Sequence, residues 1–186
     1  AFVSALKPHF EKRVLSDPND SKTTLGPLAR ADLRENLHRQ VTQSVEAGAR
    51  LEMGGEVPIG EGFFYPATLL SGVTPGMPAF DEETFGPLGV VIAATDEEDA
   101  IRLANQTNFG LGSTVITGDL QRGQWIAEEQ LQAGSCFVNS GVQSDPKLPF
   151  GGIKNSGIGR ELSRYGIREF VNVKTISVHT LEARDP

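Results

Sequence analysis

Two side chains that could bind a ligand stand close together in the acidic stretch 81–85. Glu83 offers a carboxylate, which is a strong bidentate acceptor for a pair of hydroxyl groups. Phe85, two residues later, offers an aromatic face that can hold a planar ring. The Gly86-Pro87 pair that follows would fix a turn. On residue types alone, an exposed acidic loop is the commoner meaning of such a stretch, because most carboxylates lie at the surface.

Cys136 is the only cysteine of the chain and the obvious candidate for a nucleophile. It lies in the strand-like run 135–138, and no histidine, lysine or arginine stands nearby in sequence to favour its thiolate. Free cysteines are among the most buried residues and usually pack like small apolar side chains. We therefore expect Cys136 to belong to the core. A single cysteine also fits a reducing compartment, and we expect a cytoplasmic protein.

A long glycine-rich loop follows that strand-like run. Residues 139–162 contain five glycines and two prolines, a composition that forms neither a regular helix nor a central strand. In an α/β chain, a loop that leaves the end of a strand is where ligand sites are usually built. An ordinary surface connection is the alternative, but structureless loops of this length are uncommon and often functional.

Three ordered motifs resemble those of the aldehyde dehydrogenase superfamily. Residues 149–161 read PFGGIKNSGIGRE, which is similar to the motif near the carboxyl end of these enzymes. Residues 82–87, EETFGP, resemble the Glu-x-Phe-Gly-Pro motif, and residues 104–111, ANQTNFGL, are similar to the Ala-Asn…Tyr-Gly-Leu segment. The resemblance covers nearly the whole chain as the carboxyl-terminal portion of such an enzyme. Within the superfamily it is nearest to the succinate semialdehyde dehydrogenases.

The resemblance implies that the second motif binds the cofactor, NAD or NADP. Glu83 would accept hydrogen bonds from the hydroxyls of the nicotinamide ribose, and Phe85 would pack beside the nicotinamide. The residues that discriminate NAD from NADP would lie upstream of this chain.

The resemblance also implies three roles in the glycine-rich loop. Phe150 would border the substrate tunnel, with core packing as the alternative. Ser144 matches the position that binds the distal carboxylate of the substrate in succinate semialdehyde dehydrogenases, although serine is a common loop residue. Glu161 would help to relay protons from the general base, or would form a structural ion pair with Arg160.

The chemistry of this family needs a cysteine nucleophile, a hydride acceptor and a carboxylate base. A thiolate adds to the aldehyde, the thiohemiacetal loses hydride, and water cleaves the thioester to give the acid. The order of the motifs implies that the nucleophile and the base precede Ala1. We therefore expect a fragment of an NAD(P)-dependent aldehyde dehydrogenase, inactive alone. The alternative is a non-catalytic module that keeps the fold for assembly or ligand binding.

Composition excludes several other classes of protein. The net charge is 17 − 24 = −7, so no basic field favours nucleic acid or an acidic membrane. No run approaches the roughly 18 apolar residues that are typical of a membrane-spanning helix. His9, His38 and His179 lie far apart in sequence and lack the paired spacing of a metal site, so no metal is expected.

Alternating strands and helices would position the candidate residues. Residues 88–94 are a continuous apolar run, typical of a strand that is buried on both faces of a parallel sheet, and residues 113–117 and 135–139 are the next strands. Asp96 and Asp119 precede apolar helical runs and are predicted to cap them. Short connections between these elements imply right-handed crossovers, so we expect an α/β catalytic domain of the aldehyde dehydrogenase type with a parallel sheet.

The chain is expected to contain two parts. Residues 1–170 would form part of the catalytic domain, and residues 171–186 an oligomerisation strand and tail. The resemblance implies that this strand pairs with the sheet of a neighbouring subunit, in a homo-oligomer that is a dimer or a tetramer.

Overall fold

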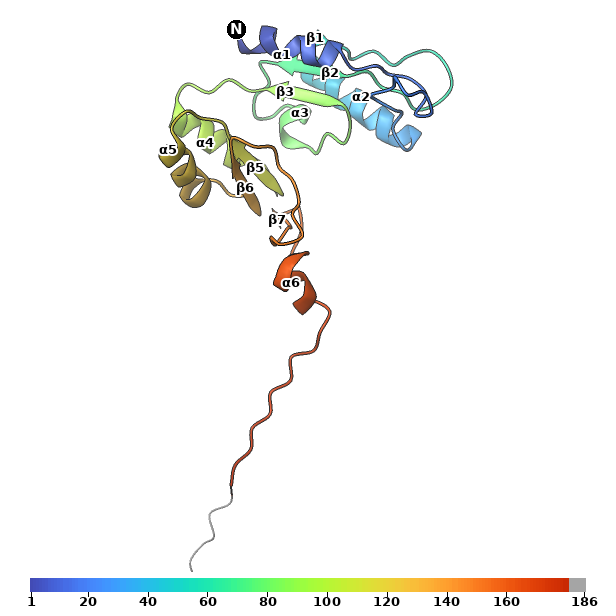
Figure 1. Ribbon diagram of the computed structural model, residues 1–186. Helices are drawn as coiled ribbons and strands as arrows, with labels where there is room; N and C mark the ends of the chain where they lie inside the picture. Colours follow the sequence, from blue (N-terminus) through green and yellow to red (C-terminus); the bar gives the residue numbers. More distant parts are fainter. Residues whose placement is uncertain (181–186) are drawn as a thin grey trace, which may run out of the picture. The chain divides into compact units, whose positions relative to one another are not determined.

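The computed structural model describes residues 1–180 of the 186-residue chain, and it divides into two compact units (Figure 1). The first unit is Ala1–Thr107, and the second begins at Asn108. Each unit contains a pair of parallel strands. The expected α/β class is therefore confirmed, although its strands belong to separate small sheets rather than to one.

The first unit is built around a three-stranded sheet. In chain order its elements are α1 (Phe2–Glu11), α2 (Ala31–Glu46), β1 (Arg50–Met53), β2 (Thr68–Ser71), α3 (Pro78–Asp81), β3 (Leu88–Val91) and α4 (Glu97–Gln106). β1 runs antiparallel to β2, and β2 runs parallel to β3. The strand predicted at 88–94 is confirmed over Leu88–Val91. Its partner is β2, and the sequence of the strand did not indicate this pairing.

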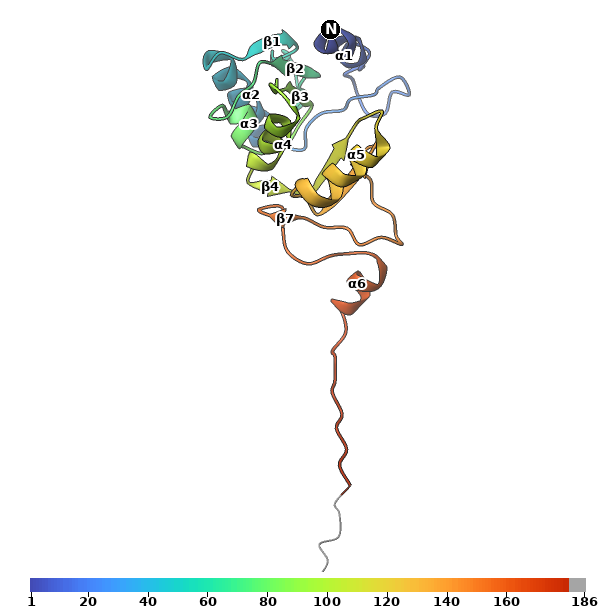
Figure 2. The ribbon, with the colours of Figure 1, turned by 90° about the vertical axis from the view of Figure 1, so that its left-hand side faces the viewer.

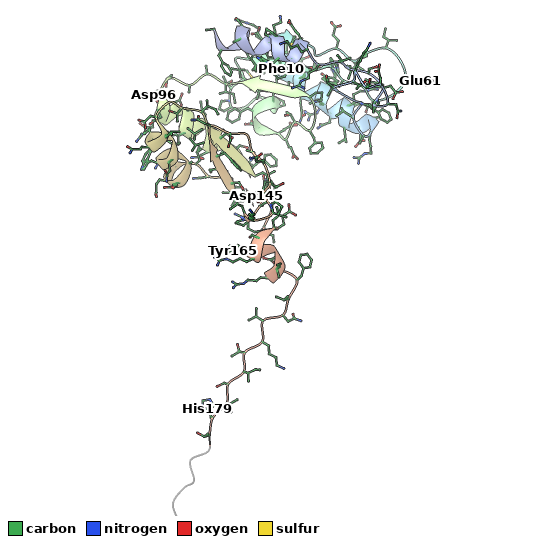
Figure 3. The ribbon with its side chains drawn as sticks, viewed as in Figure 1. Phe10, Glu61, Asp96, Asp145, Tyr165 and His179 are labelled. Carbon is green, nitrogen blue, oxygen red and sulfur yellow. The ribbon has the colours of Figure 1, made fainter. Side chains whose placement is uncertain are left out.

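The core of the first unit forms because helices cover both faces of β2 (Figure 2). Leu70 packs with Leu37 and Val41 of α2 on one face. On the other face, the Phe10 ring of α1 lies so close to Gly89 of β3 that a Cβ there would come within 2.5 Å of it (Figure 3). β2 is consequently buried along its whole length. The four-residue spacing of Leu37 and Val41 is what makes α2 amphipathic.

Tyr65 is fully buried beneath α2 and has a specific polar partner. Its hydroxyl lies 3.2 Å from Nδ1 of His38, and the two rings meet edge to face with centroids 5.9 Å apart. Burial disfavours the charged phenolate and raises the pKa of Tyr65 to about 12 from the ordinary 10.0. Because the folded-state pKa is the higher one, the stability linked to this group is complete below pH 10 and is lost as the pH rises toward 12.

Substituting Tyr65→Phe should therefore change how stability depends on alkaline pH. Below pH 9, the variant should be less stable by about 1 kcal/mol, because it loses the hydroxyl and leaves His38 without this partner. Between pH 10 and 12, only the wild type loses stability through ionisation of Tyr65, by up to about 1.4 kcal/mol per pH unit, so the difference should shrink and then reverse sign. Urea denaturation of both proteins across this range measures it. Parallel curves for the two proteins would show that Tyr65 ionises in the folded chain as it does in the unfolded one.

The second unit contains two short sheets. Its elements are β4 (Phe109–Gly110), β5 (Gly112–Val115), α5 (Leu120–Trp125), a π-helical turn η1 (Ile126–Gln130), β6 (Ser135–Val138), β7 (Ile153–Lys154) and α6 (Ser163–Arg168). β5 and β6 are parallel, as the pattern predicted, and β4 pairs antiparallel with β7. α5 makes the crossover between β5 and β6.

Both predicted helix caps are present. The carboxylate of Asp96 accepts a hydrogen bond from the Asp99 amide at the start of α4, and that of Asp119 accepts one from the Arg122 amide at the start of α5 (Figure 3 labels Asp96). α5 then packs closely on its strands at Gly123, where a Cβ would lie 2.6 Å from the side chain of Thr117. These local signals determine where the helices begin.

The carboxyl end differs from the expectation. Its last helix, α6, covers only Ser163–Arg168, because residues 150–162 form other contacts. Residues 171–180 contain no helix or strand and are exposed, and the rest of the predicted tail, 181–186, lies outside the described residues. The oligomerisation strand therefore stays a prediction, since a strand that pairs with another subunit has no partner within one chain. None of the helices formed by residues 1–180 combines the length and the apolarity needed to cross a membrane.

Candidate functional site

Glu83 and Phe85 lie in an exposed loop of the first unit, residues 82–87, between α3 and β3. Both side chains are exposed, and the Phe85 ring keeps 67% of its surface accessible. The loop itself is ordered by backbone hydrogen bonds. The Gly86 amide donates to the Thr84 carbonyl (2.9 Å), and the Thr68 amide of β2 donates to the Pro87 carbonyl (2.9 Å). The loop thus presents an acid and an aromatic ring from a backbone that is tied to the sheet.

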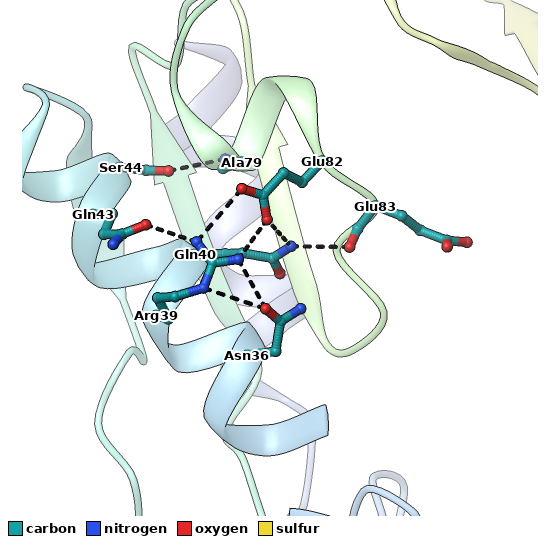
Figure 4. Close-up of polar contacts among 8 residues, drawn as sticks. All are labelled: Asn36, Arg39, Gln40, Gln43, Ser44, Ala79, Glu82 and Glu83. Carbon is teal, nitrogen blue, oxygen red and sulfur yellow. Dashed lines mark hydrogen bonds and ion pairs between the residues drawn. The ribbon is translucent and has the colours of Figure 1, made fainter. Parts of the chain in front are cut away.

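Two neighbouring residues of α2 bind the start of this loop (Figure 4). Arg39 forms an ion pair with Glu82, with 2.5 Å between Nη2 and Oε2. Gln40 donates from Nε2 to the same Oε2 at 2.9 Å and to the carbonyl oxygen of Glu83 at 3.0 Å. The hydrogen bond from Arg39, and next that from Gln40, lowers the pKa of Glu82 below its ordinary 4.5. Glu82 therefore stays ionised and keeps both contacts at neutral pH.

The carboxylate of Glu83 takes no part in this network. Figure 4 shows its side chain pointing away from Gln40 and Glu82, while its carbonyl oxygen faces Gln40. Within residues 1–180, no hydrogen bond or ion pair occupies the Glu83 carboxylate. The contacts thus distinguish the two acids, because Glu82 holds the loop on α2 while the Glu83 carboxylate is left exposed.

The glycine-rich loop of the second unit is closed by a pair of backbone bonds. The Phe150 amide donates to the Glu161 carbonyl at 2.9 Å, and the Glu161 amide donates to the Phe150 carbonyl at 2.8 Å. Phe150 and Glu161, predicted to be site residues from positions eleven apart, are therefore direct neighbours. They line a cavity of about 390 Å³ that also takes in Leu111 and Phe170.

Arg160 binds backbone carbonyl groups of the glycine-rich loop. Its Nη1 donates to the carbonyl oxygens of Gly152 (2.9 Å) and Gly159 (2.6 Å), and the expected ion pair with Glu161 is not formed. A guanidinium has five donors in a fixed fork, so it can bridge carbonyls that glycines leave without other partners. Leu162, next to this cluster, has φ of +62°, a conformation that costs a non-glycine residue about 1–3 kcal/mol and is concentrated at functional sites.

Ser144 and Cys136 are placed very differently. Ser144 is exposed in the part of the loop that precedes Phe150, and its hydroxyl has no bond within the described residues. Cys136 lies within β6, partly buried, and its Sγ accepts a hydrogen bond from Ser113 Oγ of β5 at 3.1 Å. Cys136 thus packs between two parallel strands, but it is not one of the fully buried core residues that it was expected to join. Across residues 1–180, no group of His, Cys, Asp and Glu side chains is suited to hold a metal ion.

Sequence reasoning missed Gln40 and Arg39. They stand more than 40 residues before the loop that they bind, and on a helical pattern Gln40 reads as one more polar residue of α2. Gln40 differs from the other polar residues of α2 in its burial, with only 1% of its surface exposed. The neighbouring sequence does not indicate that a single polar residue is buried.

The chain belongs to the aldehyde dehydrogenase family, whose model matches residues 1–176. Among curated relatives, it is 46% identical over 162 residues to succinate semialdehyde dehydrogenase (NAD(P)+) Sad of Escherichia coli, covering 87% of this chain and 35% of that protein. It is 42% identical over 178 residues to succinate-semialdehyde dehydrogenase (NADP(+)) 1 of Mycobacterium ulcerans, covering 96% of this chain and 39% of that protein. The chain therefore spans little more than a third of the length of these relatives.

Solved structures agree with this assignment. The succinic semialdehyde dehydrogenase of Streptococcus pyogenes, in complex with NADP+, superposes with a TM-score of 0.90 at 38% identity, covering 96% of this chain and 39% of that one. An aldehyde dehydrogenase of Mycobacterium tuberculosis, complexed with NAD+, gives a TM-score of 0.85 at 36% identity, covering 90% of this chain and 35% of that one. The fold of this chain is therefore that of an aldehyde dehydrogenase.

Proposed function

We propose that the chain works as part of a longer, NAD(P)-dependent aldehyde dehydrogenase that oxidises succinate semialdehyde to its carboxylic acid. The observation that carries this proposal is the 82–87 loop, where a carboxylate that has no partner within residues 1–180 and an exposed aromatic ring stand two residues apart on an ordered backbone. Curated relatives named for this substrate, at 42–46% identity, support the choice of aldehyde. In this proposal the nucleophilic cysteine and the general-base glutamate come from sequence outside the chain.

The residues of the loop fit a nicotinamide dinucleotide. A ribose presents two adjacent hydroxyls, which match the two oxygens of the Glu83 carboxylate, and the flat nicotinamide matches the face of Phe85. Glu83 would orient the ribose, and Phe85 would limit the tilt of the ring. When bound, the cofactor supplies a hydride acceptor. Relatives named for NADP(+) and structures in complex with NADP+ or NAD+ support either form.

In the second unit, the residues that are proposed to meet the aldehyde surround the closed glycine loop. Phe150 would exclude water from the substrate tunnel with its ring, and Glu161 would pass protons between the general base and solvent. Both line the same cavity. Their backbones bond to each other, so a shift of either residue would be transmitted to the other.

The remaining parts of the proposal concern assembly and location. Residues 171–180 expose Val171, Val173, Ile176 and Val178, an apolar series that would be covered if this segment joins a sheet of a second subunit. We therefore keep the proposal of a homo-oligomer. A cytoplasmic location remains a proposal that rests on the single cysteine.

The substrate assignment is tested at Ser144, because its exposed hydroxyl is free to bind the distal carboxylate of succinate semialdehyde. The whole enzyme should oxidise succinate semialdehyde with a higher kcat/KM than an uncharged aldehyde of similar length. Ser144→Ala should raise the KM for succinate semialdehyde by about tenfold, which corresponds to a lost charge-assisted bond of roughly 1.5–3 kcal/mol. Steady-state kinetics with both aldehydes measure the effect.

The uncharged aldehyde is the internal control for Ser144→Ala, and its KM should change less than twofold. Equal losses on both substrates would show that Ser144 supports the loop rather than the carboxylate. A wild-type enzyme with no preference for the charged aldehyde would contradict the proposed substrate while leaving the dinucleotide assignment open to its own test.

A further inference from the structure

We propose that Gln40 is a positioning residue for the dinucleotide, because its buried amide fixes the backbone from which Glu83 and Phe85 project. This inference rests on the proposed function of the 82–87 loop and adds a residue to it. Gln40 lies on α2 and touches neither a ligand nor the reacting atoms. It acts through the carbonyl group of Glu83 and the carboxylate of Glu82 (Figure 4).

The chemistry of the contacts determines how the Gln40 amide is oriented. Its two partners, a carboxylate oxygen and a carbonyl oxygen, are both acceptors, so only the NH₂ group can face them. Both N–H bonds are thereby used, at 2.9 and 3.0 Å. The Oε1 atom on the other side is buried and has no partner within residues 1–180. Without this amide, Glu82 would still be bound by Arg39, but the Glu83 carbonyl would lose the one hydrogen bond it has within residues 1–180. The site therefore requires a primary amide or an equivalent donor at position 40.

Burial makes Gln40 the stronger of the two contacts with the loop. The Arg39 and Glu82 side chains of the ion pair are 41% and 40% exposed, so water and salt screen their attraction. Gln40 is 1% exposed, and its hydrogen bonds compete with water far less. Gln40 also binds the main chain of Glu83 directly, whereas Arg39 reaches the loop only through the flexible side chain of Glu82.

A second buried polar residue on α2 provides a matched control. Ser44 lies four residues after Gln40, is fully buried, and accepts a hydrogen bond from the Ala79 amide of α3 at 2.9 Å. Gln40 and Ser44 both connect α2 to the segment that follows β2, but only Gln40 contacts the loop that carries Glu83 (Figure 4). Loss of either bond should weaken the packing between α2 and α3. Only loss of the Gln40 bonds should move the Glu83 backbone.

The experiment compares Gln40→Met with Ser44→Ala in the whole enzyme. Methionine keeps the length and volume of glutamine and removes both donors. Gln40→Met should raise the Kd of NADP+ and NAD+, measured calorimetrically without aldehyde, by about tenfold, and raise the KM of the dinucleotide to the same degree. The KM for the aldehyde should stay within twofold. Hydrogen exchange followed by mass spectrometry should show faster exchange of the amides in residues 82–87, and unchanged exchange in β3.

Ser44→Ala should lower the thermal midpoint by at least as much as Gln40→Met and leave dinucleotide affinity within twofold. Equal changes in dinucleotide Kd for the two variants would overturn the positioning role, because general destabilisation would then account for both. Unchanged exchange of residues 82–87 in Gln40→Met would overturn it as well.

The exchange measurement also separates this inference from the proposed function. If the wild-type enzyme binds neither dinucleotide, the proposed function fails and the positioning of a cofactor fails with it, even where the loop loosens in Gln40→Met. If the wild type binds and Gln40→Met binds equally well, only the positioning role is overturned.

Discussion

Substituting Glu83→Gln in the whole enzyme should raise the KM for the dinucleotide by about 10- to 100-fold. Glutamine keeps the shape of the side chain but removes the charge and one acceptor oxygen, so the ribose would lose charge-assisted bonds worth roughly 1.5–3 kcal/mol. The kcat should fall too, since a cofactor whose ribose is loosely held places its nicotinamide less accurately. Steady-state kinetics with saturating aldehyde, and calorimetric titration with NADP+, measure the two effects separately.

Two variants act as controls for Glu83→Gln. Glu56→Gln removes one exposed negative charge from the same unit, at a side chain that has no hydrogen bond or ion pair with the loop within residues 1–180, and should leave both constants within twofold. Glu82→Gln removes the neighbouring charge of the motif and should act mainly by loosening the loop, with a smaller rise in KM than Glu83→Gln. If Glu82→Gln costs more than Glu83→Gln, the two acids have been assigned the wrong way round.

The parts of this fold that sequence could predict are those that depend on neighbouring residues. An aspartate before an apolar helical run caps the helix through its own first turn, so Asp96 and Asp119 could be identified from their position alone. The four-residue spacing of Leu37 and Val41 is likewise a local pattern, and it makes α2 amphipathic. The glycine-rich composition of residues 139–162 likewise indicated backbone conformations that side chains disfavour, and Gly157 and Gly159 have positive φ angles.

The parts that sequence could not predict depend on contacts between distant segments. The partner of β3 is β2, and nothing in the apolar run 88–94 distinguishes that pairing from one with a later strand. The amide of Gln40 meets Glu83 across 43 positions, a contact that depends on how α2 packs on the sheet. An ion pair between Arg160 and its neighbour Glu161 was one of two alternatives from the sequence, but Arg160 donates instead to the carbonyls of Gly152 and Gly159. In each case the tertiary fold determines which segment lies close enough to become the partner.

The resemblance of the motifs to a known family singled out residues that local physical chemistry alone could not. Without a resemblance, Glu83 would be one carboxylate among several in an acidic stretch, and its neighbour Glu82 would be as good a candidate. The structure separates the two, because Glu82 is bound by Arg39 and Gln40 while the side chain of Glu83 is left exposed. The contacts thus show that Glu82 holds the loop, while the cofactor-binding role of Glu83 stays a prediction.

The 186-residue chain, purified by itself, should show no aldehyde-dependent reduction of NAD+ or NADP+. It supplies the 82–87 loop and the glycine loop but, in the proposed function, neither the nucleophile nor the base. Groups that act together in catalysis are strongly non-additive, so a partial set should give almost no activity rather than a share of it. The exposed apolar residues of 171–180 should also make the chain associate, which size-exclusion chromatography would detect.

A Cys136→Ser variant tests whether the isolated chain is inactive because it lacks the nucleophile. Its Sγ accepts a bond from Ser113 between two parallel strands, and within residues 1–180 no base or cation forms a hydrogen bond with it, so we expect it to be chemically inert. Cys136→Ser should therefore leave kcat of the whole enzyme within about twofold, while the isolated chain stays inactive with either residue. Serine keeps the hydrogen-bonding capacity of the position, so a loss of kcat could not be assigned to an empty space in the strand pair. Turnover by the isolated chain that disappears in Cys136→Ser would make this cysteine the nucleophile and contradict both the structural role given to it and the dependence on residues outside the chain.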